Sequence, residues 1–371
     1  FKDWASDTKI QAYIDADIIK GLTLHADYTY DIQNYNSQSY NLPVYAWNNW
    51  TNTGLVPENI STKTQASQSN SRSVLWTTNV YATYAHTFAQ DYNLKVMLGG
   101  TAEKFDYNEL SATRANLLDV NLPYLGLTDG GEKGTDMSIG NSLRHRATAG
   151  FFGRVNFDYK GIYLFEFNGR YDGSSRFPAA KQWGFFPSGS IGYRFTEENF
   201  YKATNAAQYL SNGKIRASWG QIGNEAIGNN MFISTISGPS NYLWLQGGAT
   251  NPTKYSNTPS LVSSQLTWER VETLDVGVDL GFFNNSLNLN FDWFQRDTKD
   301  MLAPGLTMPG VLGASAPYVN EGQLRTRGWE LGIGYNHSFG EFDVYANFNI
   351  YDGKTKVTKW DNDSKLLSTY Y

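Results

Sequence analysis

Residues able to carry acid–base or ligand chemistry are few and dispersed in this chain of 371 residues. Cysteine is absent, which excludes thiolate zinc sites, disulfides and cysteine nucleophiles. The histidines are scattered, and ordinary polar or packing roles suit them better than ligation. They are His25, His86, His145 and His337. We therefore expect no enzyme, no cofactor and no metal site.

One short segment does concentrate charge. Arg170, Asp172 and Arg176 have the same parity in the sequence, so on an extended strand they would share one face. Two interpretations are open for them. They could form an ion-pair network that braces the surrounding wall, or they could contact a polar ligand.

A second candidate site is aromatic. Tyr242, Trp244 and Tyr255 lie in a long stretch rich in Asn, Ser, Gly and Pro. Flat aromatic faces suit stacking against sugars, and exposed aromatics suit a protein partner. A loop packed upon itself would also explain them. All three interpretations remain open at this point.

The elements that must position these candidates are strands. From 285 to 295, Leu287, Leu289, Phe291 and Trp293 fall on one parity, and polar residues fall on the other. Successive side chains of a strand point to opposite faces, so this segment has one apolar and one polar face. Applied along the chain, the same rule predicts about twelve strands.

The connections between these strands are of two kinds. Tight turns are predicted at 20–21, 90–91, 160–161, 284–285 and 340, where polar residues or glycine separate two strand patterns. Long polar loops are predicted over about 32–72, 113–142, 224–264 and 302–321. A short helix is predicted over about 196–210, with Thr196 as its cap and Glu197 and Glu198 in its first turn.

Strand length and the asymmetry between short turns and long loops together favour strands of a membrane β-barrel. Many predicted strands have 10 to 17 residues, whereas soluble strands average about 5 or 6 and membrane barrel strands need about 9 to 11. Short turns at one end and long loops at the other are typical of outer-membrane barrels, in which the long loops are extracellular. We therefore predict an all-β fold, a transmembrane antiparallel up-and-down β-barrel, with the helix at 196–210 on the periplasmic side.

The composition agrees with a β-barrel and argues against a nucleic-acid partner. The net charge is −5, which gives no attraction to a polyanion, so a nucleic-acid role is not expected. Mean hydropathy is −0.47 and no run approaches the roughly 18 to 20 apolar residues of a membrane helix. A passive porin and a secreted carbohydrate-binding β-protein remain alternatives.

Several runs resemble the SusC-like (SusC/RagA-type) family of TonB-dependent outer-membrane transporters. They include Arg-Tyr-Asp-Gly-Ser-Ser-Arg-Phe at 170–177, Lys-Ile-Arg-Ala-Ser-Trp-Gly-Gln-Ile-Gly-Asn at 214–224, Leu-Thr-Trp-Glu at 266–269 and Arg-Gly-Trp-Glu-Leu at 327–331. Related runs at 183–200, 277–283, 292–302 and 320–322 occur between them in family order. Any single run is weakly specific, but together they cover about 170 to 356.

The resemblance implies a plugged barrel of roughly 22 strands in the bacterial outer membrane. It implies nutrient import, of oligosaccharides most often and peptides less often. It also implies a SusD-like surface lipoprotein, a TonB complex engaged through an N-terminal region, the lipid bilayer and a homodimer as partners. The sequence departs from the family pattern, because it holds neither the plug domain nor the TonB box. Its polar ending at 361–371 also completes no strand pair. We therefore expect the central-to-late part of a larger barrel.

Overall fold

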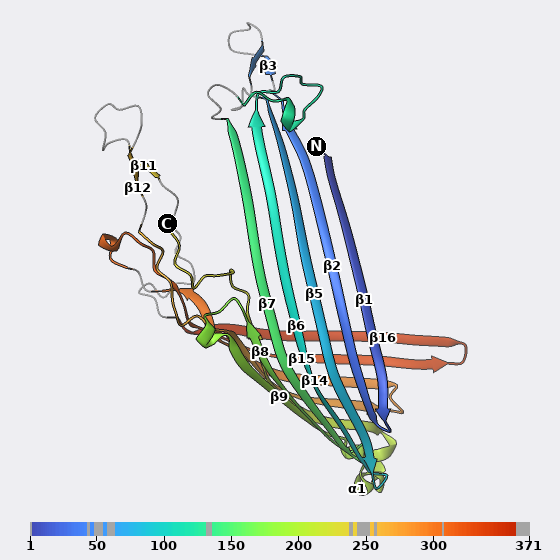
Figure 1. The fold of residues 1–371 in the computed structure, drawn as a ribbon. Coiled ribbons are helices and arrows are strands. Elements are labelled where there is room, and N and C mark those ends of the chain that lie inside the picture. The colour runs from blue at the N-terminus through green and yellow to red at the C-terminus, as the bar shows by residue number, and fades with distance from the viewer. Residues whose placement is uncertain are drawn as a thin grey trace. The chain divides into compact units, whose positions relative to one another are not determined.

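The structure is a computed structural model that describes residues 2–42, 45–47, 55–57, 64–130, 136–236, 240–242, 253–255, 258–305 and 308–360. It is almost entirely strand, and its main sheet has 12 strands (Figure 1). In sheet order these are β1 (Lys2–Ile19), β2 (Leu22–Asn41), β5 (Gln65–Phe88), β6 (Tyr92–Ala115), β7 (Met137–Tyr159), β8 (Tyr163–Ser174), β9 (Trp183–Tyr193), β10 (Leu210–Asn224), β13 (Glu269–Phe282), β14 (Leu287–Pro304), β15 (Tyr318–Phe339) and β16 (Phe342–Lys359). Each strand is hydrogen-bonded to its neighbours in the chain, as in an up-and-down barrel wall, so the predicted all-β fold and strand number are confirmed.

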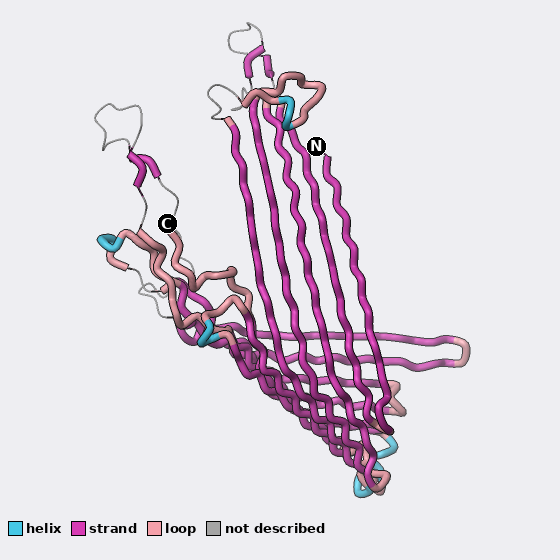
Figure 2. The backbone as a smooth tube through the Cα atoms, in the orientation of Figure 1, coloured by secondary structure: helices cyan, strands magenta, loops and turns pink. Residues whose placement is uncertain are grey.

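Two small hairpins stand apart from the main sheet. β3 (Tyr45–Trp47) pairs with β4 (Leu55–Pro57), and β11 (Ser240–Tyr242) pairs with β12 (Thr253–Tyr255). Helical segments are short and confined to the connections between strands (Figure 2). Among the described residues, no helix is long and apolar enough to cross a bilayer.

The chain divides into two compact units. The first contains residues 1–14, 26–79 and 102–147, and the second contains residues 15–25, 80–101 and 148–371. Within the second unit, β8 to β16 form a continuous antiparallel series. Figure 1 shows β14 and β15 side by side in that series.

All five predicted tight turns are present, and in the second unit they lie next to one another. The N–H of Ala85 donates to Gly21 O at 2.8 Å, and the N–H of Lys160 donates to Asp91 O at 2.8 Å. Asn336 N–H donates to Ser286 O, also at 2.8 Å. The turn residues Asn284 and Asn285 have positive φ values of 57° and 63°, which the short polar side chain of asparagine tolerates, and Lys160 also has a positive φ of 57°. Turn chemistry in the sequence was therefore sufficient to locate these hairpins.

The predicted helix over 196–210 is wrong in its extent. The only α-helical turn there is α1 (Asn199–Lys202), and 3₁₀ turns flank it at Phe195–Glu197 and Asn205–Gln208. Thr196 does not cap a helix. It is buried, its hydroxyl accepts a hydrogen bond from Gly213 N–H at 2.9 Å, and Glu198 occupies the N-cap position of α1. Thr196 thus ties this connection to β10 rather than starting a long helix.

The first strands are longer than alternation predicted. β2 continues to Asn41, β5 starts at Gln65, and β6 and β7 enclose only residues 116–136, so both ends of the predicted loops at 32–72 and 113–142 are strand. The later connections, 225–268 and 305–317, stay close to their predicted limits.

For β2 and β5, the reason is that both faces of these segments are polar. In β2, Gln33 Nε2 donates to Asp7 Oδ2 at 3.4 Å, and Asn34 Nδ2 donates to Ser6 Oγ at 3.3 Å. Gln33 and Asn34 are neighbours in the sequence, so they lie on opposite faces of the strand. A pattern search for one apolar face cannot detect such a strand.

In the second unit, one face of the sheet is apolar from strand to strand. Val276 of β13 opposes Trp293 of β14, and Trp293 opposes Trp329 of β15. Other members of this face are Phe157, Phe165, Ile191, Ile215, Val278, Leu289, Phe291, Leu331, Ile333 and Phe348. Phe165 is 49% exposed and Phe348 57% exposed, so nothing in the described chain covers this face.

Tyrosine rings border the apolar face near the tight turns. Tyr92 stacks on Tyr159 with ring centroids 4.6 Å apart, and Tyr163 stacks on Tyr193 at 5.1 Å. The Tyr163 hydroxyl donates to Glu198 Oε1 at 2.6 Å. Rings with a polar tip at the edge of an apolar surface are typical of a membrane–water interface.

The compact buried cluster of the described residues lies at the other end, among the long connections. It consists of Phe177, Phe186, Ile227 and Trp268, with Met231 and Leu302 packed against them. Trp268 Nε1 donates to Gln182 O at 2.8 Å. The cluster therefore joins the connection after β8 to the connection between β10 and β13.

Candidate functional site

The polar face of the second unit carries a charge cluster around Arg216 of β10. Its Nη2 donates to Asp292 Oδ2 of β14 at 2.7 Å, and its Nη1 lies 2.7 Å from the other oxygen of the same carboxylate. Nη1 also donates to Asp275 at 3.3 Å, and Nε donates to Asp279 Oδ2 at 3.2 Å. Asn290 donates to Asp279 at 2.8 Å. One guanidinium thus holds three carboxylates from β13 and β14.

The register explains how Arg216 reaches across a whole strand. Arg216 opposes Gly277 of β13, and Gly277 opposes Asp292. A Cβ atom built on Gly277 would overlap the Asp292 carboxylate and lie 2.8 Å from Arg216 Cζ. Glycine at 277 therefore leaves the space in which the ion pair forms.

Glu166 of β8 forms a second polar group on the same face. Asn156 donates to its Oε2 at 2.6 Å, and Asn168 donates to its Oε1 at 2.8 Å. Arg154 Nε donates to the Asn168 amide oxygen at 2.6 Å. Because both oxygens are occupied by amides, Glu166 is held in place and is not poised as an acid or base.

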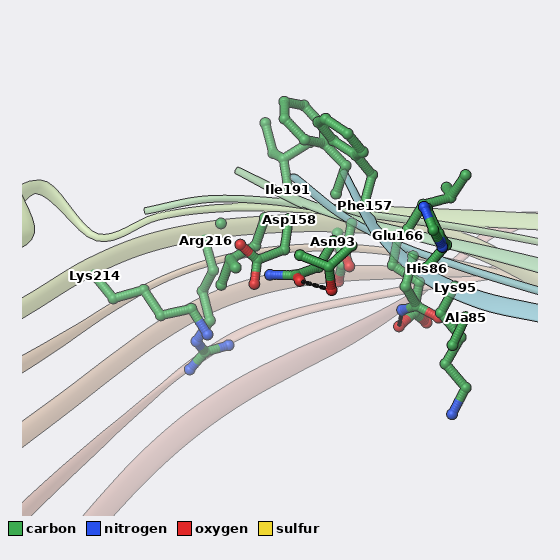
Figure 3. A pocket seen from close by; sticks show the side chains of 18 of the residues that line it. Ala85, His86, Asn93, Lys95, Phe157, Asp158, Glu166, Ile191, Lys214 and Arg216 are labelled. Atoms are coloured by element: carbon green, nitrogen blue, oxygen red, sulfur yellow. Dashed lines mark hydrogen bonds between the residues drawn. The ribbon is translucent and has the colours of Figure 1, made fainter. Parts of the chain in front are cut away.

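Arg216 and Glu166 line a common hollow of about 980 Å³. Lys214, Lys95 and Asp158 are among its other charged lining residues, so cations and anions are mixed. Figure 3 shows Phe157 and Ile191 projecting to the opposite side of the sheet from Lys214 and Arg216. The hollow can offer hydrogen bonds and charges to a polar surface or solute.

Arg170 and Asp172 come together as the sequence predicted. Arg170 Nε and Nη2 donate to the two oxygens of Asp172, each at 2.9 Å, and the guanidinium lies 5.5 Å from the Phe152 ring centroid. A Cβ on Gly150 would overlap the Asp172 carboxylate. As at Gly277, a glycine on the neighbouring strand makes room for the pair.

Arg176 makes a different contact. Its Nη1 donates to Glu225 O at 2.7 Å, which joins the connection after β8 to the connection after β10. It lies directly before Phe177 of the buried cluster. The ion-pair interpretation thus fits Arg170 and Asp172, whereas Arg176 braces two connections.

The aromatic candidates are only partly covered by the structure. Tyr242 and Tyr255 belong to the hairpin of β11 and β12, in which Tyr242 opposes Thr253 and Ser240 opposes Tyr255. Trp244 lies outside the described residues. The prediction of a sugar or partner contact at these three residues stays a prediction.

Sequence reasoning missed the Arg216 cluster. Arg216, Asp275, Asp279 and Asp292 lie up to 76 positions apart, so no local spacing marks them. The usable signal was a glycine on the polar parity of a strand, at 277, flanked by strands carrying opposite charges. Among the described residues, no group of three or more His, Asp or Glu side chains could hold a metal ion.

Residues 3–369 match the family model described as TonB dependent receptor-like, beta-barrel. TonB-dependent receptor P3 of Formosa agariphila is 31% identical over 77% of this chain, which covers 28% of that protein. TonB-dependent receptor SusC of Bacteroides thetaiotaomicron is 32% identical over 56% of this chain and 20% of its own length. The chain thus spans roughly a quarter of the length of these relatives.

Solved structures agree on the fold. The structure of the RagAB peptide transporter matches 97% of this chain and 37% of its own chain, with a TM-score of 0.82 and 22% identity. The ferric citrate transporter FecA in its unliganded form matches 96% of this chain and 44% of its own, with a TM-score of 0.53 and 9% identity. The first similarity is much closer in geometry than the second.

Proposed function

This chain belongs to the TonB-dependent receptor-like β-barrel family, and from that premise we propose that it is part of the wall of a SusC-like nutrient importer. The complete protein would import oligosaccharides, or alternatively peptides, across a bacterial outer membrane. The chain's own contribution would be wall, lumen surface and external connections. It would do no covalent chemistry.

The observation that carries this proposal is the two-faced sheet of the second unit. The apolar face from Phe157 to Phe348 is exposed, and the opposite face is lined by hydrogen-bonded charges such as Arg216 and Asp292. A secreted carbohydrate-binding protein would leave that apolar face in water at a cost of about 25 cal/mol per Å². Lipid removes that cost, so the apolar face would contact the bilayer and the polar face would line the lumen.

The connections supply the orientation. The tight turns and α1 would lie in the periplasm, with the Tyr92–Tyr159 and Tyr163–Tyr193 stacks at the inner interface. The long connections 42–64, 116–136, 225–268 and 305–317 would be extracellular. Those connections would meet a SusD-like surface lipoprotein. A TonB complex would engage a region outside this chain, and the transporter would pair as a dimer.

The candidate site residues divide between two roles in this proposal. Arg170 and Asp172 would stiffen the lumen wall, and the remaining donors of Arg170 would contact passing cargo. Tyr242, Trp244 and Tyr255 would lie in an external connection that contacts sugar or the lipoprotein. Arg176 would act indirectly, by holding the connection in which Phe177 is buried.

Uptake by cells producing the full-length protein tests the proposal. A strain lacking the gene should lose uptake of one labelled class, oligosaccharides or peptides, and regain it on complementation. Uptake should also cease when TonB is inactivated. Uptake that continues without TonB, together with steady conductance of the purified protein in planar bilayers, would instead identify a passive porin.

A matched set of variants would test the site residues. Arg170→Gln with Asp172→Asn removes the charges but keeps the shapes, and Arg296→Gln removes a cation elsewhere on the lumen face of β14. We expect the double variant to change the apparent KM for uptake and R296Q to leave it unchanged. Equal KM values for the double variant and the parent would leave bracing as the role of the pair.

A further inference from the structure

The apolar face of β14, β15 and β16 ends at one level. Trp293 opposes Trp329, and Trp329 opposes Asp352 of β16. Below this row the outward positions are apolar, as in Phe291, Leu331 and Ile350. Tryptophan at such a boundary is typical of the edge of the lipid hydrocarbon.

The next outward positions beyond the tryptophans are polar, and most of them are charged. Gln295 opposes Arg327, and Arg327 opposes Lys354. One step further, Asp297 opposes Arg325, and Arg325 opposes Lys356. All of these residues have the parity of Trp293, Trp329 or Ile350, so they lie on the face that the apolar residues occupy below.

This register places cations directly opposite cations, at Arg327–Lys354 and at Arg325–Lys356. Like charges in cross-strand pairs destabilise a sheet. Arg325 is compensated, because its Nε donates to Asp297 Oδ1 at 2.5 Å and its Nη2 donates to Asp297 Oδ2 at 3.0 Å. Among the described residues, Arg327, Lys354 and Lys356 have no carboxylate partner of this kind.

Arg327 Nε reaches only the neutral amide oxygen of Gln295, at 2.7 Å. Among the described residues, no carboxylate lies within 4.0 Å of Lys354 or Lys356. Arg327, Lys354 and Lys356 are all exposed. No carboxylate of the described residues neutralises these three positive charges.

The position of these cations along the strands, relative to the tryptophans, indicates which kind of anion they would bind. Two residues along a strand span about 7 Å, so Arg327 and Lys354 lie one residue pair above the hydrocarbon edge. The polar headgroup layer on each side of a bilayer is roughly 5 to 8 Å thick. Basic side chains at that level attract anionic lipid headgroups, and arginine can grip a phosphate with two donors.

We propose that Arg327, Lys354 and Lys356 form a binding site on the outward face of β15 and β16 for the phosphate of a membrane lipid headgroup. The site lies on the side of the long connections, which is the outer leaflet. That choice of leaflet rests on the proposed orientation, whereas the phosphate preference rests on the register alone. The bound phosphate would relieve the repulsion between Arg327 and Lys354.

The test is lipid binding to the purified full-length protein, measured by native mass spectrometry in detergent. The probes are phosphatidic acid, which carries a phosphomonoester, and diacylglycerol with the same acyl chains. Arg327→Gln and Lys354→Gln should each weaken phosphatidic acid binding about fivefold, the effect expected of one basic side chain near a membrane surface. Diacylglycerol binding should be weak and equal in all variants.

Arg296→Gln is the matched control, because Arg296 is an exposed cation on the opposite face of β14. It should bind phosphatidic acid as the parent does. Equal losses in R296Q and R327Q would mean that net charge alone sets binding, which overturns the site. Unchanged binding in R327Q and K354Q would also overturn it.

Inorganic phosphate separates a lipid site from a free-anion site. At the same concentration as the lipid it should not displace phosphatidic acid, and full displacement would overturn the assignment to a lipid. Uptake by cells carrying R327Q is measured in parallel. If lipid binding does not depend on Arg327 while uptake persists, this inference fails and the proposed import function stands.

Discussion

Arg216 on β10 and Asp292 on β14 form a two-pronged ion pair, with contacts of 2.7 Å, although β13 lies between their strands. The pair is enabled by Gly277, which occupies the position on β13 that opposes both residues. This ion pair therefore connects two strands that are not direct neighbours in the sheet. The pair connects three adjacent strands on the polar face.

A side chain at position 277 should break this arrangement. Gly277→Val would place its Cβ against the Asp292 carboxylate and Arg216 Cζ, so the ion pair must move or separate. We expect a loss of about 1 to 3 kcal/mol in the free energy of unfolding, the usual cost of overpacking. Urea unfolding of the full-length protein in liposomes, followed by heat-modifiable electrophoretic mobility, measures it.

Gly334→Ala is the control for this substitution. Gly334 lies on the same face of β15, and the nearest atom to its added Cβ is the amide oxygen of Asn347 at 3.2 Å, at the free end of a flexible side chain. It should unfold within about 0.5 kcal/mol of the parent. Equal losses in G277V and G334A would contradict the role given to Gly277.

The facing of β14 makes a second prediction. Leu289 opposes Leu280 and Ile333 on the apolar face, so Leu289→Arg should cost about 2 to 4 kcal/mol if this face contacts lipid near the bilayer midplane. Asn288→Arg, on the polar face, should lose only the hydrogen bond to Asn285 O, about 1 kcal/mol. Folding into liposomes at graded urea concentrations compares them, and equal costs would reverse or abolish the facing assignment.

A third prediction concerns the buried cluster among the long connections. Phe177 is fully buried, and its ring centroid lies 5.1 Å from that of Trp268. Phe177→Ala should cost about 3 to 5 kcal/mol locally, as in other cores. We expect faster proteolysis within 225–268 on intact cells, because that connection loses its anchor. Val311→Ala, at a residue 97% exposed, should be cut at the parental rate.

A fourth prediction is a pH dependence in the turn near α1. Lys202 Nζ donates to Glu197 Oε2 at 2.9 Å, and this hydrogen bond, assisted by the charges of Lys202 and Arg194, lowers the pKa of Glu197 below its usual 4.5. Because the folded-state pKa is the lower one, the stabilisation is present above about pH 4.5 and is lost as pH falls through the folded-state value.

Lys202→Met should therefore lower stability by a few tenths of a kcal/mol at pH 7, a small effect because both side chains are more than one-third exposed. The difference from the parent should close in acid. Thermal unfolding midpoints between pH 7 and pH 2 test this, with Lys181→Met as the control. A gap that stays constant to pH 2 would mean that Glu197 does not mediate it.

Local pattern was sufficient for much of the wall. Alternation such as Leu287 to Trp293 located the later strands, and residues such as Lys160-Gly161 and Asn284-Asn285 located the turns, because both features depend on neighbours in the sequence. Pairing of Arg170 with Asp172 was also foreseeable, since residues two apart on a strand share a face.

The sequence pattern did not predict features that depend on contacts between residues far apart in the sequence. The outer parts of β2 and β5 have two polar faces and are predicted to be loop, because hydrogen bonds between strands, not an apolar face, define them. Its sequence context predicts Thr196 as a helix cap, but its partner is Gly213, seventeen residues away. Arg176 was grouped with Arg170 by parity, yet its contact is Glu225.

By itself the sequence determined that Leu289 and Asn288 lie on opposite faces, because strand geometry allows nothing else. Which residues meet across the strands was decided only by the tertiary register. That register placed Arg216 beside Asp292 through the gap at Gly277, and set Arg327 against Lys354 above Trp329. A shift of one residue between strands would change every such pair while leaving each strand's own pattern intact.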